Sequence, residues 1–155
     1  MELHRYERWW IWIGALTMVA LFATLVTLQI VQGLTPPSHI GTIDPASVAR
    51  TPPFDHPGLR KLPDGSYDAY YVGRVFSWDP QEITIPKDAV VHFYVTSTDV
   101  MHGFEIVDTD VNVEVVPGWV SSATQTFTHR GTYLIVCNQY CGIGHQDMYA
   151  KVIVR

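Results

Sequence analysis

Residues 137–148 have the sequence Cys-Asn-Gln-Tyr-Cys-Gly-Ile-Gly-His-Gln-Asp-Met, and an isolated histidine, His102, lies upstream of them. Together they supply two thiols, two imidazoles and a thioether. Soft sulfur ligands beside imidazole select copper over hard cations such as magnesium or calcium. A site for one blue copper ion needs two histidines, one cysteine and a weak axial methionine. This chain has that set and one cysteine more.

The extra cysteine favours a site for two copper ions. Two thiolates can bridge two metals, which leaves one histidine and one weak axial group for each. Met148 can serve one copper, and the main-chain carbonyl of Gln139 can serve the other. One electron shared across the pair changes the bond lengths at each copper less than a localised charge would. A rigid loop can therefore suit both oxidation states.

Two other interpretations of the cysteines remain open at this point. Two cysteines in an extracytoplasmic domain more often form a disulfide, but His145 and Met148 in register with both cysteines favour a metal. A thioredoxin-like copper chaperone also uses Cys-x3-Cys and a distant histidine. In such a chaperone the cysteines come before the histidine, which is the reverse of the order here.

The spacing Cys-x3-Cys-x3-His-x2-Met after an upstream histidine resembles the binuclear copper A centre of cytochrome c oxidase subunit II. The sequence Cys-Asn-Gln-Tyr-Cys-Gly-x-Gly-His-Gln-x-Met is most similar to the B-type haem-copper oxidases. The resemblance implies that two copper ions accept electrons from a soluble cytochrome c. It further implies that the electrons pass to haem in subunit I, which also holds copper B, for the reduction of oxygen to water coupled to proton translocation. A small further subunit would complete the complex. The implied copper ligands are His102, Cys137, the Gln139 carbonyl, Cys141, His145 and Met148.

Three more residues are singled out by the resemblance. Phe76 and Trp78 match the aromatic stretch where electrons are accepted in this family, although partly buried strand aromatics would give the same pattern. Glu7 matches a glutamate near a proton-uptake path, although an acid at the start of a helix is also favoured by the helix dipole. Many members carry a glutamate at the place of Gln139, where its side chain helps to bind magnesium, so a magnesium role is in doubt here.

A different class of function stays open as well: a membrane-anchored copper carrier or a stand-alone electron-transfer protein. A carrier would hold Cu(I) loosely and exchange it, whereas an electron-transfer pair would stay bound through redox cycles. Quinol oxidases keep the fold but lose the ligands, so a quinol donor is not expected.

Residues 1–35 are predicted to form a single transmembrane anchor. After Glu7-Arg8 the next charged residue is Asp44, and the apolar run is long enough to span a bilayer. Arg5 and Arg8 precede the run, which predicts a cytoplasmic N-terminus and a domain on the outer, periplasmic face of a bacterial-type plasma membrane. A cleaved signal peptide would have a shorter apolar core and a small-residue cleavage site.

The remainder divides into a predicted linker over residues 36–66 and a β-rich domain over residues 67–155. Seven of the ten prolines fall in the linker, which predicts an extended, semi-rigid spacer. The domain shows many short β-type segments with turn signals between them, which favours a sandwich or barrel. We therefore expect an all-β, cupredoxin-like Greek-key sandwich or barrel with one N-terminal transmembrane helix. The predicted strands are 67–76, 82–85, 90–97, 103–107, 111–116, 123–128, 132–137 and 149–154.

The charge balance argues against a nucleic-acid partner. The chain has a formal net charge of -5, and basic patches are what nucleic acid requires. Residues 36–155 contain 13 acidic and 8 basic side chains, so this part carries the whole -5. Such acidity is expected to steer a basic cytochrome toward the domain.

Overall fold

The computed structural model describes residues 4–32 and 38–155. The chain divides into two compact units, Met1–Pro36 and Pro37–Arg155. The C-terminal end of the predicted anchor, residues 33–35, and the start of the predicted linker, residues 36–37, lie outside the described residues.

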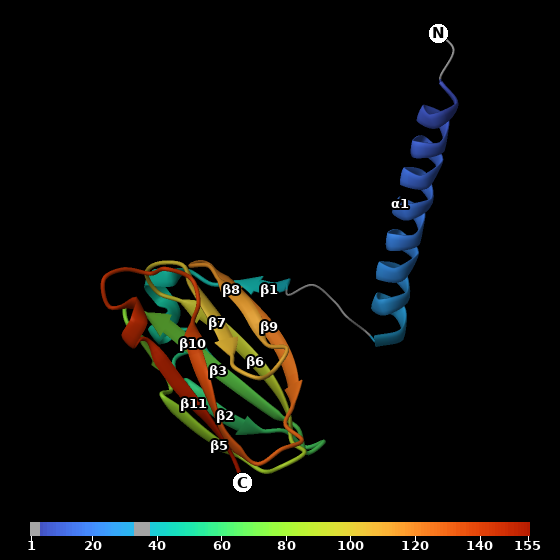
Figure 1. The fold of residues 1–155 in the computed structure, drawn as a ribbon. Helices are drawn as coiled ribbons and strands as arrows, with labels where there is room; N and C mark the ends of the chain where they lie inside the picture. The colour runs from blue at the N-terminus through green and yellow to red at the C-terminus, as the bar shows by residue number, and fades with distance from the viewer. Residues whose placement is uncertain (1–3, 33–37) are drawn as a thin grey trace. The chain divides into compact units, whose positions relative to one another are not determined.

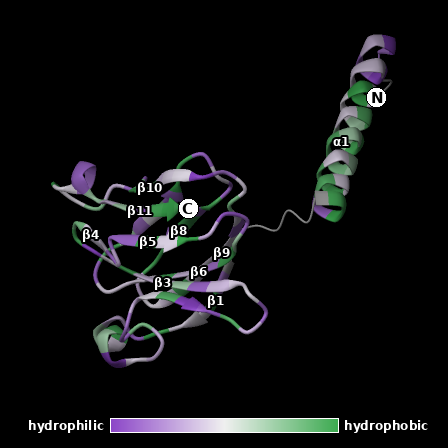
Figure 2. Cartoon of the chain, turned by 90° about the horizontal axis from the view of Figure 1, so that it is seen from below, coloured by the Kyte–Doolittle hydropathy of each residue, from purple (hydrophilic) through white to green (hydrophobic). Residues whose placement is uncertain are grey.

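The first unit contains one long helix, α1 (Arg5–Gln32). At about 1.5 Å per residue its 28 residues span about 42 Å, more than the hydrocarbon core of a bilayer. Its apolar side chains are exposed, and hydrophobic residues predominate along it in Figure 2. The hydroxyls of Thr17, Thr24 and Thr27 each donate to the carbonyl four residues earlier, so these polar groups are satisfied without water. By length and composition α1 is long and apolar enough to span a membrane.

The second unit is a sandwich of two β-sheets (Figure 1). The first sheet has the order β1-β9-β6-β3-β2, with β4 paired to β3, and the second has the order β5-β11-β10-β7-β8. The pairs β3–β6 and β5–β11 are parallel. The strands and two short 3-10 helices are β1 (Ser38–Thr42), η1 (Pro45–Arg50), β2 (Gly58–Lys61), β3 (Tyr67–Arg74), β4 (Ser77–Asp79), β5 (Glu82–Ile85), β6 (Val90–Ser97), β7 (His102–Ile106), β8 (Asn112–Val115), β9 (Trp119–Thr126), β10 (Gly131–Cys137), η2 (His145–Asp147) and β11 (Tyr149–Val154).

The main hydrophobic core lies between the two sheets and follows from strand alternation. Successive side chains on a strand point to opposite faces, so every second residue is buried. This places Val91, Phe93 and Val95 of β6 in the core, together with Val152 and Val154 of β11. The predicted all-β sandwich, with these faces turned inward, is confirmed.

The predicted linker over residues 36–66 is wrong for the part that the structure describes. β1 pairs with β9, and β2 pairs with β3. The segment between them builds a second, smaller core on the other face of β3, where Val48 and Phe54 pack with Val72. Proline did not prevent this because the prolines fall between or at the ends of elements. Pro45, for example, starts η1 at a position where a proline loses no hydrogen bond.

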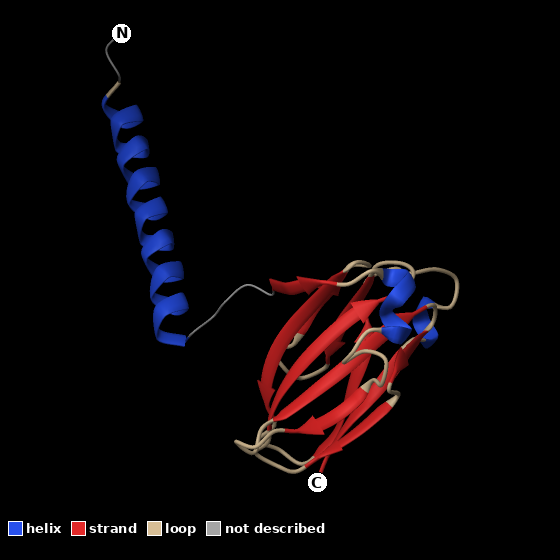
Figure 3. Cartoon of the chain, turned by 180° about the vertical axis from the view of Figure 1, so that it is seen from behind, coloured by secondary structure: helices blue, strands red, loops and turns tan. Residues whose placement is uncertain are grey.

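One end of the sandwich gathers the residues singled out by the sequence. β10 and β11 are antiparallel neighbours, and the loop 138–148 joins them there. β7 lies beside β10, with Cys137 opposite Phe104, so His102 at the start of β7 is close to the same loop. The two 3-10 helices lie at this end as well (Figure 3).

Candidate metal centre

His102 is completely buried and its Nδ1 atom faces the cysteines. The ring contributes an Nδ1 atom 3.8 Å from the Sγ atom of Cys137. Neighbouring Met101 is 38% exposed, while His102 is 0% exposed. The two side chains point to opposite faces because they are adjacent on extended backbone, which excludes Met101 as a partner of this cluster.

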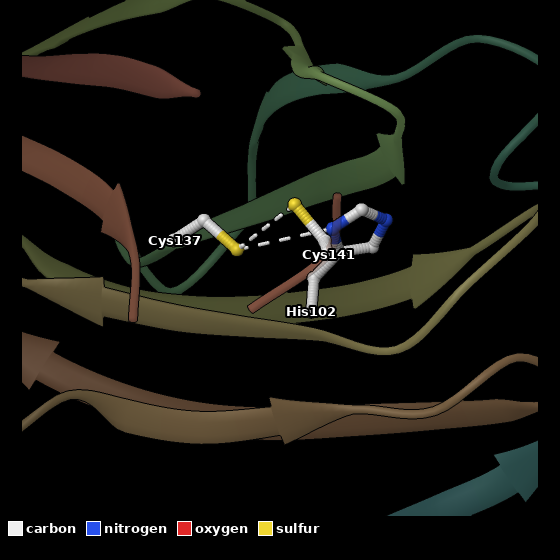
Figure 4. A group of neighbouring side chains, drawn as sticks. All are labelled: His102, Cys137 and Cys141. Atoms are coloured by element: carbon white, nitrogen blue, oxygen red, sulfur yellow. Dashed lines mark hydrogen bonds between the residues drawn. The ribbon is translucent and has the colours of Figure 1, made fainter. Parts of the chain in front are cut away.

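Cys137 and Cys141 bring their sulfurs together at this end of the core. The two Sγ atoms are 3.8 Å apart, both cysteines are free, and both are buried. The ligand atoms of His102, Cys137 and Cys141 all lie within 4.8 Å of one another. Figure 4 shows this cluster, with Cys137 facing both other side chains.

The remaining predicted ligands divide between the two sulfurs. The carbonyl oxygen of Gln139 is 3.1 Å from the Cys137 Sγ atom. His145 Nδ1 lies 3.6 Å from the Cys141 Sγ atom, and Met148 Sδ lies 3.8 Å from it. Each sulfur therefore has one imidazole nitrogen and one weak donor of its own. The structure brings together all six residues that the sequence predicted as ligands.

Backbone hydrogen bonds hold the loop in this shape. The Cys137 amide donates to the Met148 carbonyl at 3.2 Å and closes the base of the loop. Within it, the amide of His145 donates to the carbonyl of Gly142 at 3.1 Å. Gly142 has a φ of +132°, a backbone angle that residues with a side chain rarely adopt. The loop is therefore held in one shape by its own hydrogen bonds and presents its sulfur, nitrogen and oxygen donor atoms in fixed positions.

The donor set fits copper bound to sulfur and imidazole. A thiolate–metal bond is about 2.3 Å long, so one ion can join two sulfurs that are less than about 4.6 Å apart. The observed 3.8 Å separation meets this condition. Thiolate, thioether and imidazole are soft or intermediate ligands, the kind that copper prefers over hard cations.

Burial also affects the thiol of Cys141. Desolvation, together with the neighbouring Cys137, raises the pKa of Cys141 to about 11. Two such sulfurs side by side are poorly suited to carry charge without a cation, because each thiolate disfavours the other. A bound metal would supply that positive charge.

Asp99 holds His102 from behind and was not identified from the sequence. Its Oδ1 atom lies 3.0 Å from the Nε2 atom of His102. A carboxylate only accepts, so Nε2 carries the proton and Nδ1 keeps its lone pair. Partial burial raises the pKa of Asp99, but the amides of Val75 and Val100 and the His102 ring outweigh burial and lower that pKa below its usual value. An acid three residues before a ligand histidine is the signal that could have indicated this role.

Asn138 holds the other side of the loop and was also missed. Its Nδ2 atom donates to Glu105 at 2.9 Å and to Asn112 at 3.0 Å, which ties the loop to β7 and β8. The side chain lies over Gly103, where any Cβ would overlap its Oδ1 atom. Asn138 therefore fixes the backbone that leads from Cys137 to Gln139.

The other predicted residues lie in three different places. Phe76 is half-buried and its ring covers Gly142 and Gly144 of the loop. Trp78 is only 1% exposed and packs edge-on against His102 at a centroid distance of 5.6 Å, so it lies under the cluster and not at the surface. Glu7 is exposed in the first turn of α1, in the other unit.

The sandwich with its His/Cys/Cys cluster at one end defines a class of protein. It is a cupredoxin-like, copper-binding domain, carried here on a chain whose N-terminal helix is long and apolar enough to span a membrane.

Comparisons with known proteins identify the family. A family model described as "Cytochrome C oxidase subunit II, periplasmic domain" matches residues 71–154. A cytochrome c oxidase subunit 2 of Thermus thermophilus is 36% identical over 155 residues, covering 97% of this chain and 92% of that protein. A second one from Thermus thermophilus is 38% identical over 125 residues, covering 79% and 93%.

Solved structures agree. A chain of a heme-copper terminal oxidase dimer has a TM-score of 0.81 and 27% identity, and the match covers 97% of this chain and 100% of that one. The periplasmic domain of subunit II of the cytochrome oxidase of Bradyrhizobium japonicum shares the fold, with a TM-score of 0.53 over 57% of this chain. The chain belongs to the cytochrome c oxidase subunit II family and is the subunit II component of a terminal oxidase.

Proposed function

We propose that this chain holds two copper ions that accept single electrons from a soluble cytochrome c and pass them to haem in subunit I. The observation that carries the proposal is the pair of sulfurs 3.8 Å apart, each with its own imidazole and weak donor. A site for one ion has no need for the second cysteine or for two weak donors.

The proposed ligands have distinct roles. Cys137 and Cys141 would hold the two ions through their sulfurs, and His102 and His145 would hold them through their imidazoles. The Gln139 carbonyl and the Met148 thioether would be weak donors, which tune the reduction potential. When bound, the copper pair supplies a carrier for one electron at a time. The protein contributes fixed donors and a dry setting, since Met148 and both cysteines are buried.

Phe76 is the residue that we propose for electron acceptance from the donor. Its ring packs on the loop beside Ile143, which is 88% exposed, and follows Val75, which is 46% exposed. Such a concentration of exposed apolar side chains is typical of an interaction site. Trp78 is buried and would act from beneath, through its edge contact with His102.

The acidic charge of the external unit would assist the approach of a basic cytochrome. Opposite charges raise association rates in a salt-dependent way, while affinity depends more on the apolar contact. We therefore expect the rate of reduction by cytochrome c to fall as the ionic strength rises.

The membrane helix would anchor the chain beside subunit I and a small further subunit. Arg5 and Arg8 precede the apolar run, which supports a cytoplasmic N-terminus and an external copper domain. Glu7 would then lie at the cytoplasmic side, where we propose that it assists proton uptake. Glu7→Gln in the assembled oxidase should lower steady-state turnover and leave copper content intact. Unchanged turnover would remove Glu7 from the proposal.

Copper loading of the full-length chain in detergent tests the central proposal. The protein, reduced and then exposed to copper, should bind two ions per chain and become purple. Its electron paramagnetic resonance spectrum should show one unpaired electron shared equally by two copper nuclei, as a seven-line hyperfine pattern. A four-line pattern with one copper per chain would refute the binuclear site. Rapid transfer of the bound copper to a chelator during redox cycling would favour the carrier alternative.

A further inference from the structure

We propose that Asp99 is a positioning residue that joins the copper ligand His102 to the Phe76 segment through the two oxygens of one carboxylate. The inference rests on the proposed function, because it assigns a role to Asp99 at the same site. Asp99 lies in the turn between β6 and β7, in the segment Thr98-Asp99-Val100.

The Oδ1 atom of Asp99 holds the proposed copper ligand His102. It accepts from the His102 ring at 3.0 Å and from the Val100 amide at 2.6 Å. His102 is completely buried, and the Asp99 carboxylate is the partner that the structure gives its Nε2 atom. Partners of this kind fix the orientation and tautomer of a metal-binding histidine. Here they direct the lone pair of Nδ1 toward the Cys137 sulfur.

The Oδ2 atom of Asp99 holds the segment that carries Phe76. It accepts from the amide of Val75 at 2.7 Å, across a sequence separation of 24 residues. Val75 precedes Phe76, whose ring covers the glycines of the copper loop. The same carboxylate thus fixes the backbone on which the electron-accepting surface is built.

The roles of the two carboxylate oxygens can be separated by substitution. In Asp99→Ala the hydrogen bonds of both oxygens are lost, and the Nε2–H group of His102 loses its carboxylate partner. In Asp99→Asn one oxygen remains. In the Oδ1 position it can accept from the His102 ring, the Val100 amide and the Ser97 hydroxyl, whereas in the Oδ2 position it can accept only from the Val75 amide. The amide oxygen should therefore stay on the His102 side and turn the NH₂ group toward the Val75 amide, where two donors repel each other.

The experiment uses the full-length chain in detergent, loaded with copper. Asp99→Ala should weaken copper binding by about 10–100-fold in competition with a chelator and make the hyperfine couplings of the two coppers unequal. Asp99→Asn should keep the affinity and spectrum of the wild type but be reduced more slowly by cytochrome c. The slower reduction should persist at high salt, where a simple charge effect is screened. Asp110→Asn, at an exposed turn position with the same change of charge, is the matched control and should behave as wild type.

Three results would overturn the proposal. They are unchanged copper affinity and spectrum in Asp99→Ala, a wild-type reduction rate at high salt in Asp99→Asn, or rapid solvent exchange of the His102 Nε2 proton in the Cu(I) form of the wild type. The proton measurement needs no variant, so it tests the hydrogen bond between Asp99 and His102 even if Asp99→Ala fails to fold. A wild-type chain that binds fewer than two coppers would instead refute the proposed function, whatever Asp99 does.

Discussion

The ring of Phe76 lies so close to Gly144 that a Cβ atom at residue 144 would come within 2.6 Å of the Phe76 Cδ2 atom. Gly144 has a φ of -100°, which any residue can adopt, so the glycine is needed for contact with Phe76 and not for a special backbone conformation. We expect Gly144→Ala to displace the ring and destabilise the unit by about 1–3 kcal/mol, as overpacking does. Reduction by cytochrome c should slow while both coppers stay bound, which stopped-flow kinetics and elemental analysis can measure.

Gly41→Ala is the matched control for this substitution. A Cβ at residue 41 meets no atom within 4 Å, so neither stability nor the reduction rate should change. If Gly144→Ala accepts electrons as fast as the wild type, then the position of the Phe76 ring is unimportant for electron acceptance.

Met148 provides a test of the weak axial donor. Its side chain is 2% exposed, and leucine fills a similar volume, so Met148→Leu should cost less than about 1.5 kcal/mol of stability. Loss of the thioether should raise the reduction potential, since the oxidised state loses a donor, and should leave two coppers bound. Potentiometric titration of the purple band measures the effect. An unchanged potential would exclude Met148 as a ligand.

Substitution of Gln139 and of Asn138 by alanine should affect different properties, although the two residues are neighbours. Gln139→Ala should keep both coppers, because only its main-chain carbonyl faces Cys137. Asn138→Ala removes two hydrogen bonds that are each worth about 0.5–1.5 kcal/mol, so it should lower the free energy of unfolding by about 1–3 kcal/mol. Chemical denaturation and elemental analysis of the two variants test this. Loss of copper from Gln139→Ala would require a role for its side chain.

Tyr70 should titrate later than an ordinary tyrosine. Desolvation, together with the hydrogen bond from its hydroxyl to Asp68, raises its pKa to about 12, compared with about 10 in free peptides. Folding therefore favours the neutral phenol. This contribution to stability is fully present below about pH 10 and is lost as the pH rises through about 12. Ultraviolet titration should show one late-titrating phenol fewer in Tyr70→Phe than in the wild type, because burial also raises the pKa values of Tyr71 and Tyr94.

Apart from β4, the sequence predicted the strands of residues 67–155, because their apolar residues alternate and their ends carry turn residues. It did not predict β1, β2 or β4. These strands are short, and the prolines around β1 and β2 suggested a spacer. The place of β1 in the sheet depends on a partner that is remote in sequence, β9, which no local pattern indicates.

The proposed ligand cluster was predictable for a related reason. Five of the six proposed ligand residues lie at fixed spacing within residues 137–148, so local sequence carries the signal. The supporting residues do not. The contact of Asp99 with Val75 and the contacts of Asn138 with Asn112 and Glu105 span 24 to 33 positions. For Trp78 the sequence allowed both an electron-accepting role and a partly buried strand position, until its contact with His102 was known.

We expect the residue types at positions 103 and 138 to change together during evolution. Gly103, directly after the proposed ligand His102, leaves just enough room for the asparagine that braces the loop. A relative that acquires a methyl group at the first position should have given up the amide at the second, and with it the link to Glu105 and Asn112. Alignments of oxidases should therefore show these two positions covarying, even in lineages where all six ligands are invariant.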